Sequence, residues 1–264
     1  AGASNGMIDL SWLRDNAPDD GSVNIIDWTS AYAGIGLWGP NSRKVLKSLC
    51  EDDDVSNEQF PFFSIKNISI SHVPCIAVRI SYIGELGWEI YTPTEYGLTL
   101  WDELRSKSLE YNMICSGAGA FESLRLEKGY RSLGSDIHTN TNPYEAGLGF
   151  TVKLKKENNF IGKEALMKLK ESPLEKKLCC MVMSDSEGMA LGKEPIYDNH
   201  GKSVGYVSST NYGYFVDKHI IYGYLPQHYA EEGTKLELDY FGKRYPITVT
   251  KEPLLDPENK RLKS

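Results

Sequence analysis

Short apolar runs separated by turn residues dominate the chain between residues 60 and 91. The run 76–82 is rich in β-forming residues and predicts a strand, 84–87 contains two glycines and predicts a turn, and 88–91 predicts the returning strand. Runs of this kind that follow one another closely favour antiparallel pairing. The pattern therefore predicts a sheet of short antiparallel strands in this part of the chain.

Helical periodicity appears on both sides of these strands. After a strand and glycine turn within 22–38, Pro40 predicts a helix that places Val45, Leu46 and Leu49 on one side. Thr92-Pro93-Thr94-Glu95 resembles a capping box and predicts a helix to about residue 111, with Trp101 and Leu104 facing inward. Two further helices are predicted at 117–128, ended by Gly129, and at 163–170.

The last third of the chain has an almost purely β pattern. Five apolar runs separated by Gly- and Asn-containing turns predict a small barrel or sandwich, at 178–184, 203–209, 219–225, 234–240 and 244–250. A charged, proline-containing link at 171–177 precedes them, so we expect one domain at 1–172 and another at 173–264. The long polar segment 130–150 is predicted to be a functional loop.

Composition limits the possible partners. The chain has 264 residues, a net charge of −7, and no run of 18 apolar residues, so we expect no nucleic-acid partner, no membrane partner and no signal peptide. The basic residues at 260–263 are predicted to be a solvated end of the chain. Five scattered cysteines without Cys-x-x-Cys or Cys/His spacing predict buried free thiols and no metal site.

Glu89 is the most informative single residue, because it lies among bulky apolar neighbours. A carboxylate there must either face water across the pleat or meet a hydrogen-bonding partner. The first interpretation makes Glu89 an ordinary surface residue. In the second it accepts paired N–H donors from a flat heterocycle, with Tyr82 and Trp88 supplying ring surface.

Two other motifs carry weaker signals. Residues 34–39 spell G-x-G-x-x-G, but Pro40 starts the helix after the third glycine, whereas a dinucleotide site needs that glycine inside the helix. Asp136 and His138 could act as an acid–base pair, but no nucleophile lies near them in the sequence. Loop hydrogen bonding is the simpler interpretation.

Four motifs in order resemble the aminomethyltransferase (glycine-cleavage T-protein) superfamily over about residues 20–262. They are Tyr82-x-Gly84-Glu85-x-Gly87-x-Glu89, Ser123-Leu124-Arg125-Leu126-Glu127-Lys128-Gly129-Tyr130, Asn142-Pro143-x-Glu145-Ala146-Gly147-Leu148 and Phe160-Ile161-Gly162-Lys163-x-Ala165-Leu166. With Arg131 and the closing Asp256-Pro257-x-Asn259-Lys260-Arg261, the chain is most similar to the carboxy-terminal folate domain of sarcosine and dimethylglycine dehydrogenases.

The resemblance implies an α+β fold, with a ferredoxin-like α/β region followed by a small carboxy-terminal β-barrel. It implies that tetrahydrofolate is the cofactor and that Tyr82, Glu85, Glu89 and Phe121 bind it, with Glu89 gripping the pterin's N–H edge. Where T-proteins have an arginine two positions before Ser123, this chain has Phe121, so the charged contact is in doubt, and Phe121 packs on the ligand or fills the core.

In such dehydrogenases a flavin domain oxidises an N-methyl amine and folate captures the carbon as 5,10-methylene-tetrahydrofolate. This chain shows no convincing flavin motif, and the family's catalytic aspartate should precede residue 1. We therefore expect part of a larger polypeptide that is inactive alone, with FAD on an upstream domain. The mitochondrial matrix is the family's usual eukaryotic location, and a bacterial cytoplasm fits the composition equally well.

Two other functions stay open. The scaffold resembles that of a non-catalytic regulatory subunit similar to the pyruvate dehydrogenase phosphatase regulatory protein, and that of a stand-alone aminomethyltransferase. The pattern Glu127 to Arg131 argues against the first, because such regulatory relatives are expected to lose it. A related iron–sulfur-maintenance branch carries a cysteine where this chain has Tyr130, which sets that branch aside.

Overall fold

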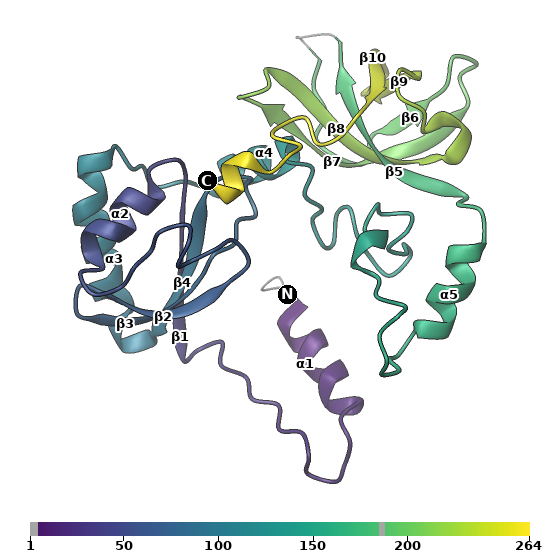
Figure 1. Ribbon diagram of the computed structural model, residues 1–264. Coiled ribbons are helices and arrows are strands. Elements are labelled where there is room, and N and C mark those ends of the chain that lie inside the picture. The colour runs from purple at the N-terminus through teal and green to yellow at the C-terminus, as the bar shows by residue number, and fades with distance from the viewer. Residues whose placement is uncertain (1–4, 185–187) are drawn as a thin grey trace. The chain divides into compact units, whose positions relative to one another are not determined.

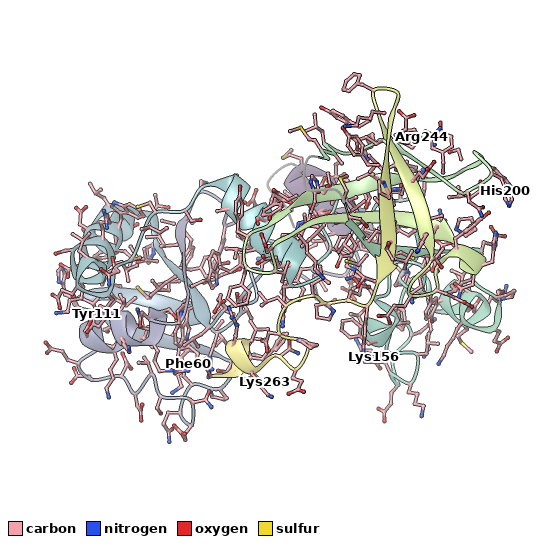
Figure 2. All side chains as sticks on the ribbon, turned by 90° about the horizontal axis from the view of Figure 1, so that it is seen from above. Phe60, Tyr111, Lys156, His200, Arg244 and Lys263 are labelled. Atoms are coloured by element: carbon pink, nitrogen blue, oxygen red, sulfur yellow. The ribbon has the colours of Figure 1, made fainter. Side chains whose placement is uncertain are left out.

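The computed structural model describes residues 5–184 and 188–264, and the chain forms two compact units (Figure 1). Unit 1 comprises Ala1–Cys115 together with Asn259–Ser264, and unit 2 comprises Ser116–Glu258. Phe60 and Tyr111 lie in unit 1, and His200 and Arg244 in unit 2 (Figure 2).

Unit 1 is built on a four-stranded antiparallel sheet in the order β1-β4-β3-β2. Its strands are β1 (Tyr32–Trp38), β2 (Ile65–Ile70), β3 (Val73–Val78) and β4 (Gly87–Pro93). The helices α2 (Ser42–Leu49) and α3 (Gly97–Ser108) contact each other and pack on one face of the sheet. The remaining elements are α1 (Gly6–Asp15), η2 (Thr94–Tyr96), η3 (Leu109–Tyr111) and α6 (Lys260–Lys263).

Alternation along β4 separates the two faces of this sheet. Trp88 and Ile90 are fully buried in the core that α2 and α3 cover, where Trp88 meets the ring of Phe60. Glu89 and Tyr91 therefore point to the opposite face, since successive side chains of a strand alternate. Trp88 is thus a core residue, and the expectation that it supplies ring surface to a ligand is wrong.

The predicted hairpin is confirmed as antiparallel pairing of β3 with β4, but its strand ends four residues earlier than expected, at Val78 instead of Tyr82. The amide of Ile80 donates to the carbonyl of Val78 at 3.0 Å, which turns the chain out of the sheet. Arg79 is fully buried and donates to Asn57 Oδ1 at 2.6 Å. Residues 79–86 are consequently a loop, and Tyr82 lies in it.

The helix predicted after Thr92 is confirmed as η2, α3 and η3, but the capping box is wrong. The Thr92 hydroxyl donates to the carbonyl of Pro74 at 2.8 Å, and η2 has no side-chain cap. Leu104 is buried as expected, whereas Trp101 remains 41% exposed. The tertiary partner on β3 has therefore displaced the local cap.

Unit 2 begins with α4 (Ala118–Glu127), the predicted helix, which Gly129 follows with a φ of +72°. The segment 130–150 is a loop as predicted, apart from one isolated bridge and η4 (Gly149–Thr151). The predicted helix at 163–170 is α5 (Lys163–Glu171).

A closed antiparallel barrel of six strands follows, in the order β10-β5-β8-β7-β6-β9. Its strands are β5 (Lys176–Met183), β6 (Pro195–Tyr197), β7 (Ser203–Gly213), β8 (Lys218–Pro226), β9 (Lys235–Tyr240) and β10 (Lys243–Thr250), with η5 (Gln227–Tyr229) after β8. All but β6 were predicted. This three-residue strand pairs with β7 and β9 and so closes the ring.

The α+β fold class with a carboxy-terminal barrel is confirmed, while the domain boundary at 172/173 stays a prediction. All five cysteines are free; four are buried as expected, but Cys115 is exposed. Cys179 faces the barrel core and Cys180 an outer cluster with Leu126, as strand alternation requires. Within the described residues, no helix is long and apolar enough to cross a membrane.

Candidate functional site

Glu89 lies half-buried on the face of the unit 1 sheet opposite the helices. It pairs with Gly36 of β1 and with Val78 of β3, so both of its neighbours across the sheet are small or apolar. The indole of Trp38 occupies the space over Gly36, because a Cβ built there would lie 2.1 Å from the ring. The cross-strand neighbours of Glu89 thus offer its carboxylate neither a hydrogen-bonding side chain nor a charge.

Tyr91 is the partner that orients this carboxylate. Its hydroxyl donates to Glu89 Oε2 at 2.5 Å, from two residues further along the same strand face. Burial, together with the hydrogen bond to Glu89 and its charge, raises the pKa of Tyr91 to about 12, so the phenol stays protonated and remains a donor. A carboxylate accepts about four hydrogen bonds, and Tyr91 uses one of them.

An apolar cavity of about 400 Å³ lies on this face, lined by Tyr91 and by Val78, which pairs with Glu89 across the sheet. Its walls come from all four strands and the segment before β1, and comprise Trp28, Thr29, Tyr32, Gly34, Ile65, Ile76, Val78 and Tyr91. Trp28 and Tyr32 stack with ring centroids 5.3 Å apart and 12° between the planes. Gly34 provides room for the Tyr91 ring, which lies 3.2 Å from where a Cβ would stand. The cavity is therefore wide enough for a planar ring.

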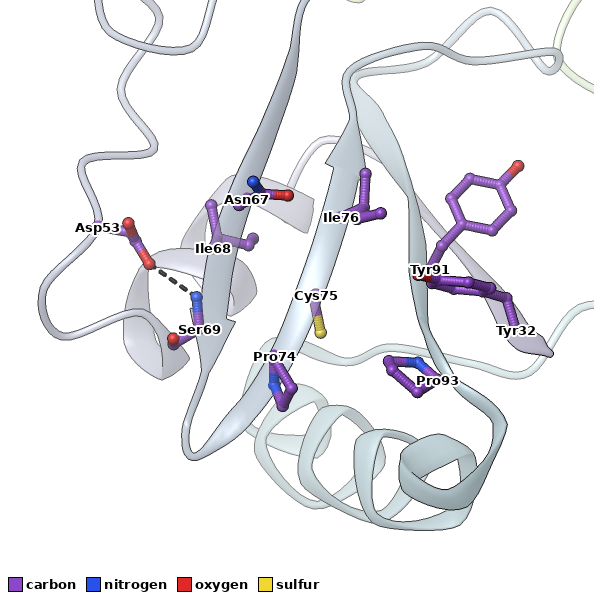
Figure 3. A pocket seen from close by; sticks show the side chains of 10 residues that line it. All are labelled: Tyr32, Asp53, Asn67, Ile68, Ser69, Pro74, Cys75, Ile76, Tyr91 and Pro93. Carbon is purple, nitrogen blue, oxygen red and sulfur yellow. Dashed lines mark hydrogen bonds between the residues drawn. The ribbon is translucent and has the colours of Figure 1, made fainter. Parts of the chain in front are cut away.

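A second cavity of about 400 Å³ shares Tyr32, Ile76 and Tyr91 with the first and extends toward β2. Figure 3 shows Asn67, Ile76 and Tyr91, which come from three neighbouring strands. Asp53 closes its edge by accepting a hydrogen bond from the amide of Ser69 at 2.7 Å. The open face thus offers apolar walls that continue into a more polar end.

This chemistry suits a flat, uncharged heterocycle that carries N–H donors. Neither cavity has a lysine or arginine among its lining residues, so no described side chain there would hold a phosphate. The ring walls can bury a planar group, while the remaining acceptor positions of Glu89 can receive paired N–H groups in parallel. The pterin of a reduced folate fits both requirements.

The four residues that the sequence predicts as folate ligands have different surroundings in the structure. Glu89 has the geometry just described, and Tyr82 lies half-buried in the neighbouring loop 79–86. Glu85 forms an ion pair with Arg261 of α6, at 2.5 Å between Oε1 and Nη1. Phe121 is half-buried on α4 of unit 2. All four assignments to folate stay predictions.

The sequence analysis missed Tyr91 as a site residue. The signal was present, because Glu89-x-Tyr91 on a strand places both side chains on one face. It also placed 260–263 in solvent, which is wrong for two of these residues. Leu262 is 2% exposed and Arg261 pairs with Glu85, since the segment turns back onto unit 1.

The glycine motif at 34–39 is part of β1 and the turn that follows it. Gly34 and Gly36 pair with Tyr91 and Glu89 through the sheet, and their missing side chains make room for Tyr91 and Trp38. A dinucleotide loop would instead lead directly into a helix. These glycines therefore serve the packing of the open face.

Asp136 belongs to a buried network in unit 2. It forms an ion pair with Arg125 at 2.7 Å and accepts a hydrogen bond from Ser208 at 2.5 Å. The two charges are almost fully buried, which requires such pairing. His138 takes no part in this network and accepts a bond from the amide of Asn140 at 3.3 Å. The interpretation of 136–138 as loop hydrogen bonding therefore agrees with the contacts.

Among the residues that the structure describes, no group of three or more His, Cys, Asp or Glu side chains is placed to hold a metal ion. Asp53, which lines the second cavity, accepts a hydrogen bond from the amide of Ser69. The chemistry available on the open face is therefore binding and orientation by one carboxylate and its phenol partner.

Comparison with known proteins finds two matching family models. One, described as the GCVT N-terminal domain, matches residues 1–156, and the other, described as the glycine cleavage T-protein C-terminal barrel domain, matches residues 176–256. Among solved structures, the chain is similar to glycine cleavage system aminomethyltransferase T from Bartonella henselae. The TM-score is 0.82 at 24% identity, over 96% of this chain and 67% of that one, which supports a common fold.

Three curated relatives cover nearly the whole chain. It is 37% identical to human mitochondrial dimethylglycine dehydrogenase over 99% of its length, and 34% identical to human mitochondrial sarcosine dehydrogenase over 90%. These matches span only 30% and 26% of the two dehydrogenases. An aminomethyltransferase of Halothermothrix orenii is 33% identical over 96% of this chain and 69% of its own length.

Proposed function

Because the chain belongs to the glycine cleavage T-protein (aminomethyltransferase) family, as its motifs indicate, we propose that it binds tetrahydrofolate on the open face of the unit 1 sheet. The observation that carries the proposal is Glu89, a half-buried carboxylate bonded to Tyr91, whose ring lines an apolar cavity on the same face of the sheet. A carboxylate in apolar surroundings is costly unless donors meet it, and the pterin edge supplies such donors.

Each side chain has a defined task in this proposal. Glu89 accepts the N–H groups of the pterin, and Tyr91 holds the carboxylate in the orientation that these donors require. The aromatic and branched walls, among them Tyr32 and Ile76, bury the ring faces and exclude water. Tyr82 and Phe121 are the further folate-binding residues that we propose from the family resemblance. The resemblance also implies Glu85 as a ligand, but its carboxylate is paired with Arg261.

When bound, tetrahydrofolate supplies two amine nitrogens that take up a one-carbon unit at the oxidation level of formaldehyde, with release of water. In this proposal Glu89, Tyr91 and the cavity walls hold the pterin, and none of them is assigned a contact with the one-carbon unit. We accordingly assign them binding and orientation, and no proton transfer.

The chain spans only about 30% of the length of the dimethylglycine dehydrogenases that it resembles. We propose that it is the folate portion of an N-methyl amine dehydrogenase of this kind, in which FAD and the amine belong to further sequence. The names of two relatives support a mitochondrial location, and the bacterial aminomethyltransferases support a bacterial cytoplasm. Of the two, we propose the mitochondrial matrix.

A stand-alone aminomethyltransferase is the second candidate, because the chain covers 69% of such an enzyme at 33% identity. A non-catalytic regulatory subunit is a third, from a different class of protein. Amine-dependent reduction of a flavin in the complete gene product separates the dehydrogenase from both.

Titration with tetrahydrofolate tests the proposal directly. Exchanging Glu89→Gln should weaken binding about 10- to 100-fold, since a hydrogen bond to a charged group contributes about 1.5–3 kcal/mol. Isothermal calorimetry under anaerobic conditions gives the dissociation constants. Glu95→Gln, on the exposed surface at η2, is the matched control and should bind as the unmodified chain does.

Equal affinity of the unmodified chain and the Glu89→Gln variant would remove Glu89 from the site. If neither bound folate, the proposed function itself would be wrong.

A further inference from the structure

Loop 79–86, which carries Tyr82, is fixed to unit 1 near both ends by hydrogen bonds to its backbone. At its start, the indole of Trp38 donates to the carbonyl of Ile80 at 3.1 Å. At its end, the carbonyl of Leu86 accepts bonds from the Gly39 amide at 2.8 Å and from the Ser42 hydroxyl at 3.0 Å. These bonds fix where the loop leaves and re-enters the sheet.

The second half of the loop is also held by the ion pair between Glu85, its next-to-last residue, and Arg261. Glu85 is 15% and Arg261 34% exposed, and the guanidinium approaches to 2.5 Å. A partly shielded pair at this distance is stronger than one on an open surface. The two residues are 176 positions apart in the sequence, so the contact forms only when residues 259–264 lie on unit 1.

Residues 259–264, which we call the strap, have firm anchors of their own. Leu262 is buried, and the carbonyl oxygen of Ser264 accepts hydrogen bonds from Arg43 at 2.7 Å and from Arg79 at 2.8 Å. Arg79 is itself fully buried at the first position of the loop. The strap therefore holds Arg261 against the loop and does not merely extend a flexible side chain toward it.

We propose that Arg261 is a positioning residue, and that the strap fixes loop 79–86 in the conformation that presents Tyr82 to the folate. This inference rests on the proposed function, because Tyr82 is a ligand only if folate binds. It gives Glu85 a different task from the one that the sequence predicts: Glu85 anchors the loop and does not touch the cofactor. It also gives a role to the closing motif Asp256-Pro257-x-Asn259-Lys260-Arg261.

The experiment combines affinity with a readout of the loop. Tetrahydrofolate affinity and hydrogen–deuterium exchange of peptides covering 79–86 are measured for Arg261→Met, Glu85→Gln and the exchanged pair Glu85→Arg with Arg261→Glu. Each single variant should bind about three- to tenfold more weakly and exchange faster in the loop, because misplacing a contact by a small distance lowers affinity. The exchanged pair should restore both properties to within about twofold.

Arg244→Met is the matched control, since Arg244 is 35% exposed and pairs with Asp239 at 3.0 Å on the barrel (Figure 2). It should leave affinity and loop exchange unchanged. The proposal would be overturned if both single variants kept the affinity and the loop exchange of the unmodified chain. It would also be overturned if the exchanged pair, while folded by circular dichroism, recovered neither affinity nor loop exchange.

The two proposals fail in different ways. If the unmodified chain did not bind folate, the proposed function would be lost, while the exchange rates would still decide whether Arg261 holds the loop. If the Arg261→Met and Glu85→Gln variants bound folate as tightly as the unmodified chain, while Glu89→Gln bound it more weakly, the role of Arg261 would be lost and the proposed function kept.

Discussion

At the scale of single residues, the spacing of two between Glu89 and Tyr91 is the decisive feature. Their side chains share the open face of β4, and one hydrogen bond of 2.5 Å orients the half-buried carboxylate of Glu89 as an acceptor. The apolar surroundings of Glu89 can be recognised in the sequence. That Glu85 pairs with Arg261 cannot, because no local pattern reports a contact between residues 176 positions apart.

The substitution Tyr91→Phe should weaken tetrahydrofolate binding about three- to tenfold, since it removes one orienting hydrogen bond worth about 1 kcal/mol. Calorimetry on this variant, beside Tyr96→Phe on the exposed surface, gives the comparison. An affinity equal to that of the unmodified chain would show that Glu89 needs no partner to hold its position.

The same variant should change the stability at high pH. Burial raises the pKa of Tyr91 from 10 to about 12, so between these values the folded chain holds a proton that the unfolded chain has lost. The free energy of unfolding should therefore fall as the pH rises from 10 to 12, and this loss should be smaller in Tyr91→Phe. Urea unfolding at pH 9 and pH 11 measures the difference.

At the scale of elements, the sequence predicts most helices and strands but not the points where tertiary contacts intervene. The helix α4 follows from its periodicity and from Gly129. The strand β3 ends early because Arg79 is drawn into the core, and the three residues of β6 are too few to show a period. Thr92 matches a cap in sequence but bonds to another strand.

The two glycines flanking the Trp38 indole should respond differently to alanine. The three atoms nearest to a Cβ on Gly36 would all belong to the Trp38 ring, whereas a Cβ on Gly87 would lie 2.3 Å from the carbonyl oxygen of Leu37. The ring can move, but the paired backbone cannot. We expect Gly36→Ala to lower the free energy of unfolding by about 1–3 kcal/mol and Gly87→Ala to lower it by more.

Urea denaturation followed by tryptophan fluorescence compares the two variants. An equal loss of unfolding free energy in the two variants would mean that β1 and β4 separate more easily than their pairing indicates.

At the scale of the whole molecule, the barrel depends on residues that precede it in the chain. Leu126 of α4 packs with Leu178, Cys180, Ile220, Tyr222 and Tyr224 on the outside of the barrel, and the buried pair of Arg125 with Asp136 also bonds to Ser208 and Ser209. A fragment that starts at the boundary expected from the sequence would expose this cluster. The second compact unit begins at Ser116 and so includes α4 and the loop 130–150.

We therefore expect a fragment of residues 116–258 to unfold cooperatively in urea, and a fragment of residues 173–264 to be less stable and to bind a hydrophobic dye. Removing the partners of several buried apolar side chains costs about 2–5 kcal/mol for each large one. Equal stability of the two fragments would show that α4 and the loop 130–150 contribute little to the barrel.

The closure of the barrel by β6 has one more consequence, for self-association. Within the described residues, each strand of the barrel has a partner on both sides, whereas the sheet of unit 1 ends in two edge strands, β1 and β2. We therefore expect recruitment of a foreign strand, and any fibril seeded by it, to begin at one of those edges. Ile65, which is 64% exposed on β2, marks where a lysine would discourage such growth.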